Sequence, residues 1–260
     1  MHIQGSVVLI TGASEGIGAA CVESFRKRGA RLVLVARRRE MLERFAGPDT
    51  LIAPADVTNA EDRRRAVSAA MDRFGTIGIL INNAGIGLYE PAWQAPFEEV
   101  RRMFDLNLFA ALGMVQLTAP HMIQQRRGMI VNISSIAGKM TLPWFTMYSA
   151  SKFALGSMTD GLRMELKPYG VRAMTVCPGY VRTGFQDHVI AGSPPPGIRR
   201  AKRFAIDAGE CAEAIARGVE RNARTVVTPR AGWLLIALQR LMPRLMDAQL
   251  ARMLQRLEHE

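Results

Sequence analysis

Short apolar runs alternate with amphipathic stretches along most of this chain. Seven runs have the length and composition of buried strands: Val7–Ile10, Arg31–Ala36, Thr50–Pro54, Ile79–Asn82, Met129–Ile133, Arg172–Val176 and Thr225–Thr228. The stretches between them have helical character, near residues 16–28, 38–46, 59–74, 97–124, 146–168 and 209–222. Because strand–helix–strand crossovers are right-handed and place their strands parallel, this order predicts an α/β fold: a doubly wound, seven-stranded parallel sheet with helices on both faces.

The chain has 260 residues, which suits a single α/β domain with a C-terminal helical extension. We predict that residues 1–228 form the sheet domain and residues 229–260 the extension. Within the domain, residues 184–207 are loop-like, with a proline-rich centre, Ser193-Pro194-Pro195-Pro196-Gly197, and four basic residues after it, Arg199, Arg200, Lys202 and Arg203. This segment follows the sixth strand, at the strand ends where ligands bind, so we expect a substrate lid.

The net charge of +11 raises the question of a polyanionic partner. Much of the excess lies between Arg26 and Arg44, and we find no zinc spacing, basic heptad array or aromatic-interleaved RNA motif. We therefore expect no nucleic-acid partner. The three cysteines, Cys21, Cys177 and Cys211, are widely spaced and odd in number, so we interpret them as buried apolar residues and expect no metal site. With no signal peptide, we expect a cytoplasmic protein.

The C-terminal extension combines apolar and basic residues. Its apolar run Trp233–Leu238 is followed by Leu241-Met242, and after Pro243 five apolar residues recur at helical spacing: Met246, Leu250, Met253, Leu254 and Leu257. Arg244, Arg252 and Arg256 lie among them. Such a helix packs on its own domain or on a second subunit, or residues 229–257 make a peripheral contact with an anionic membrane surface. The pattern leaves these alternatives open.

A glycine-rich turn joins the first predicted strand to the first predicted helix. It reads Thr11-Gly12-Ala13-Ser14-Glu15-Gly16-Ile17-Gly18. Glycines let a backbone approach a pyrophosphate closely, and a helix N-terminus offers free N–H groups and the positive end of its dipole. A tight strand-to-helix turn that binds no ligand can have the same composition. The motifs that follow are therefore needed to distinguish a dinucleotide-binding turn from a plain one.

Further motifs follow in a fixed order. They are Asn82-Asn83-Ala84-Gly85 after the fourth strand, Asn107 in the next helix, Ile133-Ser134-Ser135 after the fifth strand, Tyr148-Ser149-Ala150-Ser151-Lys152, and Pro178-Gly179 with Thr183 after the sixth. From Val7 to Thr183 this series resembles the TGxxxGxG, NNAG and YxxxK pattern of the short-chain dehydrogenase/reductase family. The resemblance implies a Rossmann-type fold and an oxidoreductase that interconverts a ketone and a secondary alcohol with a nicotinamide cofactor.

The resemblance also implies a set of cofactor-binding residues. These are Gly12, Ser14, Glu15, Gly16, Ile17, Gly18, Arg37, Asp56, Val57, Asn83, Ala84, Gly85, Tyr148, Lys152, Pro178, Gly179, Val181 and Thr183.

The predicted catalytic residues are Asn107, Ser135, Tyr148 and Lys152. Tyr148 and Lys152 are four residues apart and therefore share a helix face. We expect the Lys152 ammonium, with the positive nicotinamide ring, to lower the pKa of Tyr148, which then exchanges a proton with the substrate oxygen. Ser135 is thirteen residues before Tyr148 and is expected to donate a hydrogen bond to that oxygen, while Ser134 has a structural role. By resemblance, Asn107 holds a water that connects Lys152 to solvent.

The choice of cofactor depends on the end of the second strand. NAD-selective relatives usually have an acidic residue where this chain has Ala36, and Arg37 follows. A guanidinium suits a 2′-phosphate, so we expect NADP(H), with NAD(H) as the alternative. Two observations oppose this: Arg37–Arg39 also fit a solvated helix start, and Glu15 occupies a position where many NADP-dependent relatives carry a basic residue.

The expected substrate pocket is apolar. The residues expected near it are Ile86, Leu88, Tyr89, Trp144, Phe145, Met147, Tyr180 and Phe185, some of which we expect to pack in the core instead. We expect an apolar, lipid-like carbonyl or alcohol substrate. By resemblance, the protein forms a homodimer or homotetramer through the long helices near 97–124 and 146–168. The alternative is a dinucleotide-binding sensor or scaffold whose C-terminal helix binds a membrane or a partner.

Overall fold

The computed structural model describes residues 1–185, 189–192 and 205–258. Seven parallel strands form the central sheet: β1 (Val7–Thr11), β2 (Arg31–Ala36), β3 (Thr50–Pro54), β4 (Ile79–Asn82), β5 (Gly128–Ile133), β6 (Val171–Pro178) and β9 (Thr225–Thr228). Their order across the sheet is β3-β2-β1-β4-β5-β6-β9. The predicted doubly wound sheet is confirmed. Its chain order reverses between β1 and β4, which is where open sheets of this kind bind ligands.

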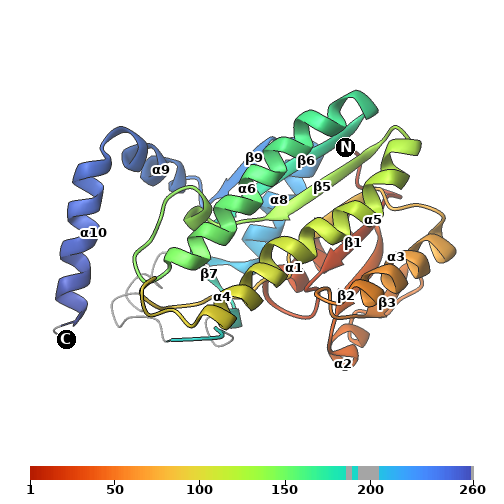
Figure 1. The fold of residues 1–260 in the computed structure, drawn as a ribbon. Coiled ribbons are helices and arrows are strands. Elements are labelled where there is room, and N and C mark those ends of the chain that lie inside the picture. The colour runs from red at the N-terminus through yellow and green to blue at the C-terminus, as the bar shows by residue number, and fades with distance from the viewer. Residues whose placement is uncertain (186–188, 193–204, 259–260) are drawn as a thin grey trace.

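Helices cover both faces of the sheet (Figure 1). They are α1 (Gly16–Arg26), α2 (Arg39–Glu43), α3 (Ala60–Phe74), α4 (Phe97–Phe104), α5 (Ala111–Gln124), α6 (Thr146–Leu166) and α8 (Ala208–Glu220). Strand side chains alternate between the faces, so Val8 and Ile10 pack in the core cluster that includes α1 and α8. Val7 and Leu9 pack in the opposite cluster, with α3 and α5. Both faces are therefore buried, as the continuous apolar strands predict.

The cysteines are buried in these layers. Cys21 on α1 and Cys211 on α8 lie in the same core cluster, and Cys177 is buried on β6. Burial raises the pKa of each thiol. These residues therefore pack as small apolar side chains, as predicted.

The helix predicted over residues 97–124 is not uniform. Between α4 and α5 the chain forms a π-helical segment, η1 (Asp105–Ala110). Such segments often mark functional sites, and this one carries Asn107. Phe97–Gln124 is also long and apolar enough to span a bilayer by length and composition, and half of its most apolar window is buried inside the domain.

The described parts of the predicted lid are partly ordered into secondary structure. The short strands β7 (Val181–Arg182) and β8 (Ile206–Asp207) pair in parallel, which the sequence pattern did not predict. Asp207 then begins α8 with a capping box that includes Glu210. The proline-rich centre of the lid and its four basic residues lie outside the described residues.

Outside the lid, one short 3-10 turn precedes α6 and another follows it, namely η2 (Ile136–Gly138) and η3 (Lys167–Tyr169).

The C-terminal extension begins directly after β9. It comprises α9 (Gly232–Leu241) and α10 (Pro243–Glu258). α9 packs against the domain through Ile236, which is buried with Cys177 and Val227. α10, at the blue end of the ribbon, stands away from the sheet and its covering helices (Figure 1).

Candidate active site

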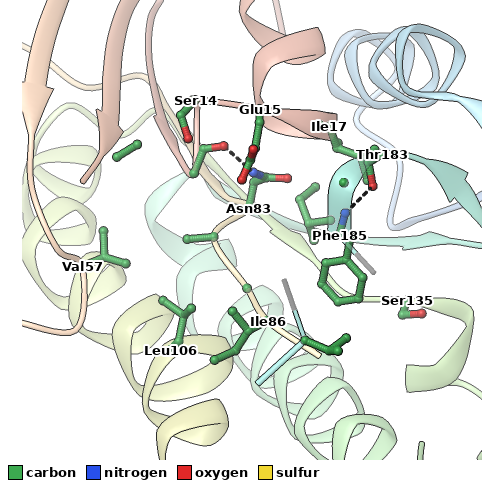
Figure 2. A pocket seen from close by; sticks show the side chains of 18 of the residues that line it. Ser14, Glu15, Ile17, Val57, Asn83, Ile86, Leu106, Ser135, Thr183 and Phe185 are labelled. Carbon is green, nitrogen blue, oxygen red and sulfur yellow. Dashed lines mark hydrogen bonds between the residues drawn. The ribbon is translucent and has the colours of Figure 1, made fainter. Parts of the chain in front are cut away.

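A cleft of about 750 Å³ opens at the carboxyl ends of the strands, around the point where the strand order reverses. It brings together all but two of the residues predicted for the site. Those lining it are Gly12, Ser14, Glu15, Gly16, Ile17, Arg37, Asp56, Val57, Asn83, Ala84, Gly85, Ser135, Tyr148, Lys152, Pro178, Gly179, Val181 and Thr183. Figure 2 shows how side chains from separate elements surround this space. The other two, Gly18 and Asn107, are not part of the lining.

The glycine-rich turn forms one wall of the cleft. Gly12 and Gly16 have positive φ angles, and a Cβ at Gly18 would overlap the Gly12 carbonyl oxygen. Gly18 is therefore needed for close packing of turn and helix, which explains its place behind the lining. The first turn of α1 contains no acidic residue, and the side chain of its N-cap residue, Glu15, makes no cap hydrogen bond. These features fit a dinucleotide pyrophosphate, because a helix N-terminus binds anions with its backbone N–H groups.

Thr11 and Asn83 hold this wall against the strand next to it. The Asn83 side-chain amide donates hydrogen bonds to the carbonyl oxygens of Thr11 (3.0 Å) and Gly12 (3.1 Å). In return, the Thr11 hydroxyl accepts hydrogen bonds from the backbone N–H groups of Asn83 and Ala84. Two motifs more than 70 residues apart in sequence thus form one rigid unit. Thr11 was not predicted as a site residue, although it opens the glycine-rich motif.

Asn107 is buried behind the cleft and ties its own helix to two other segments. Its side-chain oxygen accepts a hydrogen bond from the Ile86 N–H (2.9 Å), and its amide donates to the Ile86 carbonyl (3.0 Å) and to the Ser151 hydroxyl (3.1 Å). A Cβ at Gly85 would lie 3.0 Å from the Asn107 oxygen and 3.2 Å from the Lys152 ammonium. Gly85 therefore allows Asn107 and Lys152 to lie close together, as their predicted roles require.

Lys152 is buried beneath Tyr148. Its ammonium donates a hydrogen bond to the Ile133 carbonyl (3.1 Å) and lies 5.6 Å from the centre of the Tyr148 ring. Burial lowers the pKa of Lys152 to about 8, because the charged form loses its hydration. The ammonium is therefore close to losing a proton at physiological pH.

Tyr148 lies in a stack of aromatic rings. The Phe145 ring is centred 4.2 Å from it on one side, and the Phe185 ring is 5.8 Å away. Burial raises the pKa of Tyr148 above its usual value, while a hydrogen bond with the Ser135 side chain opposes the rise. The expected lowering of the pKa is not produced by the protein's own groups, because desolvation outweighs the Ser135 hydrogen bond. Tyr148 is therefore protonated at neutral pH.

The two serines after β5 have different partners. Ser135 is partly exposed in the cleft, shares a hydrogen bond with Tyr148 and accepts one from the Ala137 N–H (3.1 Å). Ser134 is buried, and its hydroxyl donates to the Lys152 carbonyl (2.9 Å). This difference agrees with the alternation expected at the end of an extended strand.

Five of the eight residues predicted for the substrate pocket line the cleft, namely Ile86, Tyr89, Phe145, Tyr180 and Phe185. The other three do not line it. Leu88 is completely buried in the core cluster around Met103, and Met147 packs against that cluster from the first turn of α6. Trp144 has a left-handed backbone just before that helix and is not part of the lining. Proximity in sequence could not show which way each side chain turns.

The cleft also contains charged residues that the sequence analysis did not predict as site residues. Arg38 pairs with Glu15 at 3.1 Å, and both line the cleft beside Arg37. Arg102 and Asp105 line it from the helical run before Asn107. Arg102 and Asp105 are five and two residues before Asn107, so helical spacing from Asn107 does not indicate them. The pairing of Arg38 with Glu15 depends on how the glycine-rich turn and the end of β2 meet in space.

A doubly wound sheet with a glycine-rich turn at the switch point of a large cleft defines a nucleotide-binding α/β protein. The family model described as short chain dehydrogenase matches residues 6–193, more than half of the chain. The chain therefore belongs to the short-chain dehydrogenase/reductase family and is an oxidoreductase that acts on CH–OH groups.

Two curated relatives are similar to much of this chain. Ketoacyl reductase HetN of Nostoc is 36% identical over 211 residues, which are 78% of this chain and 74% of that protein. A 3-ketodihydrosphingosine reductase of Bacteroides thetaiotaomicron is 36% identical over 186 residues, 72% of this chain and 68% of that protein. Both names describe reductases.

Two solved structures share the fold over nearly the whole chain. A short-chain dehydrogenase from Burkholderia cenocepacia in complex with NADP has a TM-score of 0.83 and 32% identity, covering 96% of this chain and 99% of that one. A short-chain dehydrogenase/reductase from Burkholderia phymatum in complex with NAD has a TM-score of 0.85 and 26% identity, covering 95% and 96%.

Proposed function

We propose that this protein is an NADP(H)-dependent oxidoreductase that interconverts an apolar, lipid-like ketone and its secondary alcohol. The observation that carries the proposal is that Ser135 and Tyr148 line the same cleft, with the Lys152 ammonium 5.6 Å from the centre of the Tyr148 ring. These groups place two hydroxyls where a carbonyl oxygen can accept hydrogen bonds from both. Such an arrangement stabilises charge that develops on oxygen.

Each residue has a distinct task in this proposal. When bound, the nicotinamide dinucleotide supplies or accepts the hydride. Tyr148 donates its phenolic proton to the substrate oxygen in reduction and receives it back in oxidation. Ser135 orients that oxygen. Lys152 assists through its charge, and Asn107 holds the backbone at Ile86 and, as the family resemblance implies, a water that resupplies the proton.

The residues that would hold the dinucleotide are those of the glycine-rich wall, the ends of β2 and β3, and the segment after β6. The preference for NADP(H) is supported by two arginines, Arg37 and Arg38, which line the cleft directly after Ala36, the position where NAD-selective relatives usually have a carboxylate. A guanidinium binds a phosphate through paired hydrogen bonds. The NADP complex of the Burkholderia cenocepacia relative supports the same preference.

An apolar substrate is supported by the aromatic side chains around Tyr148. The rings of Tyr89 and Phe145 stack with their centres 4.2 Å apart, and the Phe185 ring is centred 5.8 Å from the Tyr148 ring. Phe185, Val189 and Ile190, from the described part of the lid, pack with this cluster. Such a surface favours apolar groups, since it offers them a place out of water. The names of the ketoacyl and ketodihydrosphingosine reductases point to the same substrate class.

The test is turnover by the Tyr148→Phe variant. With NADPH and a panel of long-chain and aromatic ketones, we expect kcat to fall at least about 100-fold, because the proton donor is lost. NADPH binding, measured by fluorescence, should be unchanged. Tyr169→Phe is the matched control, because Tyr169 lies on the exposed side of η3. Unchanged turnover would refute the mechanism, and tight NADPH binding without any turnover of the panel by the native chain would favour a sensor or scaffold.

We also propose the organisation of the active protein. Residues 1–228 form the catalytic domain with its lid over 184–207, and residues 229–260 form the helical extension. The proposed assembly is a homodimer or homotetramer in the cytoplasm. The subunit contact is supported by Phe109 and Phe153, which are exposed on the helices near 97–124 and 146–168. Light scattering after size exclusion tests the subunit number: a native chain that runs as a monomer would contradict it.

A further inference from the structure

The C-terminal arm, which we define as α9 and α10, exposes large apolar side chains. Those on its surface are Trp233, Leu234, Leu235, Leu241, Met242 and Leu245. Leu234 is 64% exposed and Leu241 is 80% exposed, far more than a leucine that packs in a core. α10 packs against α9, and α9 packs against β9. The arm thus presents an apolar face that the domain itself does not cover.

Each helix of the arm carries exposed arginines beside exposed apolar side chains. At 100° per residue, Trp233, Ala237 and Leu241 share one side of α9, and Ile236 faces the domain. On α10, Met246 and Leu250 lie on one side, Arg244 lies roughly opposite Met246, and Arg252 lies beside Leu245. Arginines that border exposed tryptophan and leucine side chains suit a membrane interface, where the apolar groups can enter the lipid and the guanidinium groups can reach the headgroups.

The charge of the arm selects the kind of partner. Residues 229–252 contain four arginines, Arg230, Arg240, Arg244 and Arg252, against one acidic residue, Asp247. All four arginines are exposed. A two-fold contact between two copies of this face would bring these arginines near one another, which like-charge repulsion disfavours. An anionic lipid surface complements both the charge and the apolar side chains.

The arm is rooted next to the predicted catalytic residues. Gly232 packs so closely on Ile136 that a Cβ there would lie 2.6 Å from the Ile136 side chain. A Cβ at Gly179, which lines the cleft, would lie 3.1 Å from the same side chain. Ile136 directly follows Ser135. The arm also leaves the domain after β9, at the carboxyl end of the parallel sheet, which is the end that carries the cleft.

We propose that the C-terminal arm docks the protein on anionic lipid bilayers, with the cleft end of the sheet toward the membrane. Trp233, Leu234, Leu241 and Leu245 enter the headgroup region, and the arginines bind lipid phosphates. The proposal deepens the proposed function, because a lipid-like substrate is then presented at the end of the domain where the cleft opens.

Vesicle co-sedimentation of the full-length chain tests the docking. The vesicles contain phosphatidylcholine alone or phosphatidylcholine with about one third phosphatidylglycerol. We expect binding to the anionic vesicles and about tenfold or more weaker binding to the neutral ones, with the difference reduced by salt. Equal binding to both, or binding to neither, would overturn the proposal.

Substitutions separate the apolar from the electrostatic contribution. Leu234→Glu with Leu241→Glu should weaken binding to anionic vesicles by about 100-fold or more. Its control is Trp93→Glu with Phe97→Glu, since Trp93 and Phe97 are 84% and 70% exposed outside the arm. Arg240→Gln with Arg244→Gln should weaken binding about 30-fold. Arg64→Gln with Arg65→Gln on α3 is the control, and both control pairs should bind like the native chain.

Other outcomes identify other occupants. If the paired glutamates change the subunit number measured by light scattering and leave vesicle binding intact, the face is a contact between copies and the docking proposal is wrong. Thermal unfolding of each variant confirms that it is folded. The Tyr148→Phe variant should bind vesicles like the native chain, so a failure of the catalytic proposal is distinguishable from a failure of docking.

Discussion

The carboxylate of Glu15 and the guanidinium of Arg38 form an ion pair 3.1 Å long, which joins the glycine-rich turn to the residues that follow β2. Both side chains are about half exposed and both line the cleft. Glu15 therefore neutralises part of the charge that we expect to attract a 2′-phosphate. The preference between NADPH and NADH therefore depends on two opposing effects. The Glu15 carboxylate repels a 2′-phosphate, and the guanidinium groups of Arg37 and Arg38 attract it.

Glu15→Gln should strengthen the preference for NADPH. Removing the carboxylate removes its repulsion of a phosphate and leaves the Arg38 guanidinium available, so we expect the KM for NADPH to fall about fivefold. The KM for NADH should change by less than about twofold. Initial rates with each cofactor at saturating ketone measure this. Glu61→Gln, which alters a similar exposed ion pair on α3, is the control. Equal changes for the two cofactors would contradict the interpretation.

Arg37→Asp should act in the opposite direction. Here a guanidinium is replaced by a carboxylate at the end of β2, so we expect the KM for NADPH to rise at least about tenfold more than the KM for NADH. The ratio of the two kcat/KM values is the measurement, with Arg64→Asp as a surface control. A parallel loss with both cofactors would mean that Arg37 does not contact the phosphate.

Ser135→Ala and Ser134→Ala should differ although the residues are adjacent. Ser135→Ala removes the hydroxyl that bonds Tyr148, and we expect kcat to fall about 100-fold with unchanged NADPH binding. Ser134→Ala removes a buried hydrogen bond to the Lys152 carbonyl, and we expect a loss of about 1 kcal/mol in the free energy of unfolding with kcat largely kept. Steady-state kinetics gives kcat for both variants, and urea unfolding gives their free energies of unfolding. Similar kcat losses in the two would show that their roles were wrongly divided.

Lys152 should make stability depend on pH in an alkaline window. Its pKa is lowered from 10.5 to about 8 by burial, so between these values the unfolded chain binds more protons than the folded one. The contribution of Lys152 to the free energy of unfolding therefore rises with pH through that window. Burial of Lys152 destabilises the folded chain most below about pH 8.

The test of this linkage is the Lys152→Met variant. The quantity compared is the free energy of unfolding of Lys152→Met minus that of the native chain. We expect this difference to be about 2 kcal/mol larger at about pH 7.5 than at about pH 10. Urea unfolding of both chains at the two pH values gives this difference, since titrations common to both chains cancel. Lys167→Met, on the surface, should show no such change. A pH-independent difference for Lys152→Met would show that the ammonium is not destabilised by burial.

Much of the sheet could be read from local pattern. The seven strands were predicted within two residues of their observed bounds, because runs such as Ile79–Asn82 are apolar on both faces. The short strands β7 and β8 were missed, since two-residue strands carry no periodic signal. The π-helical segment at Asn107 was also missed; the Asn107 side chain makes its hydrogen bonds to Ile86 and Ser151, which are far away in the sequence.

The sequence by itself determined which residues meet at the cleft, because strand order and motif spacing place the glycine-rich turn, Ser135 and Tyr148 at one edge of a parallel sheet. The tertiary structure alone decided the direction in which the pKa of Tyr148 shifts, since that pKa is raised by burial among rings that include Phe145 and Phe185. It also decided the pairing of Glu15 with Arg38 and the exposure of the arm. Periodicity and motifs are local properties, whereas desolvation and ion pairing depend on which atoms surround a side chain in space.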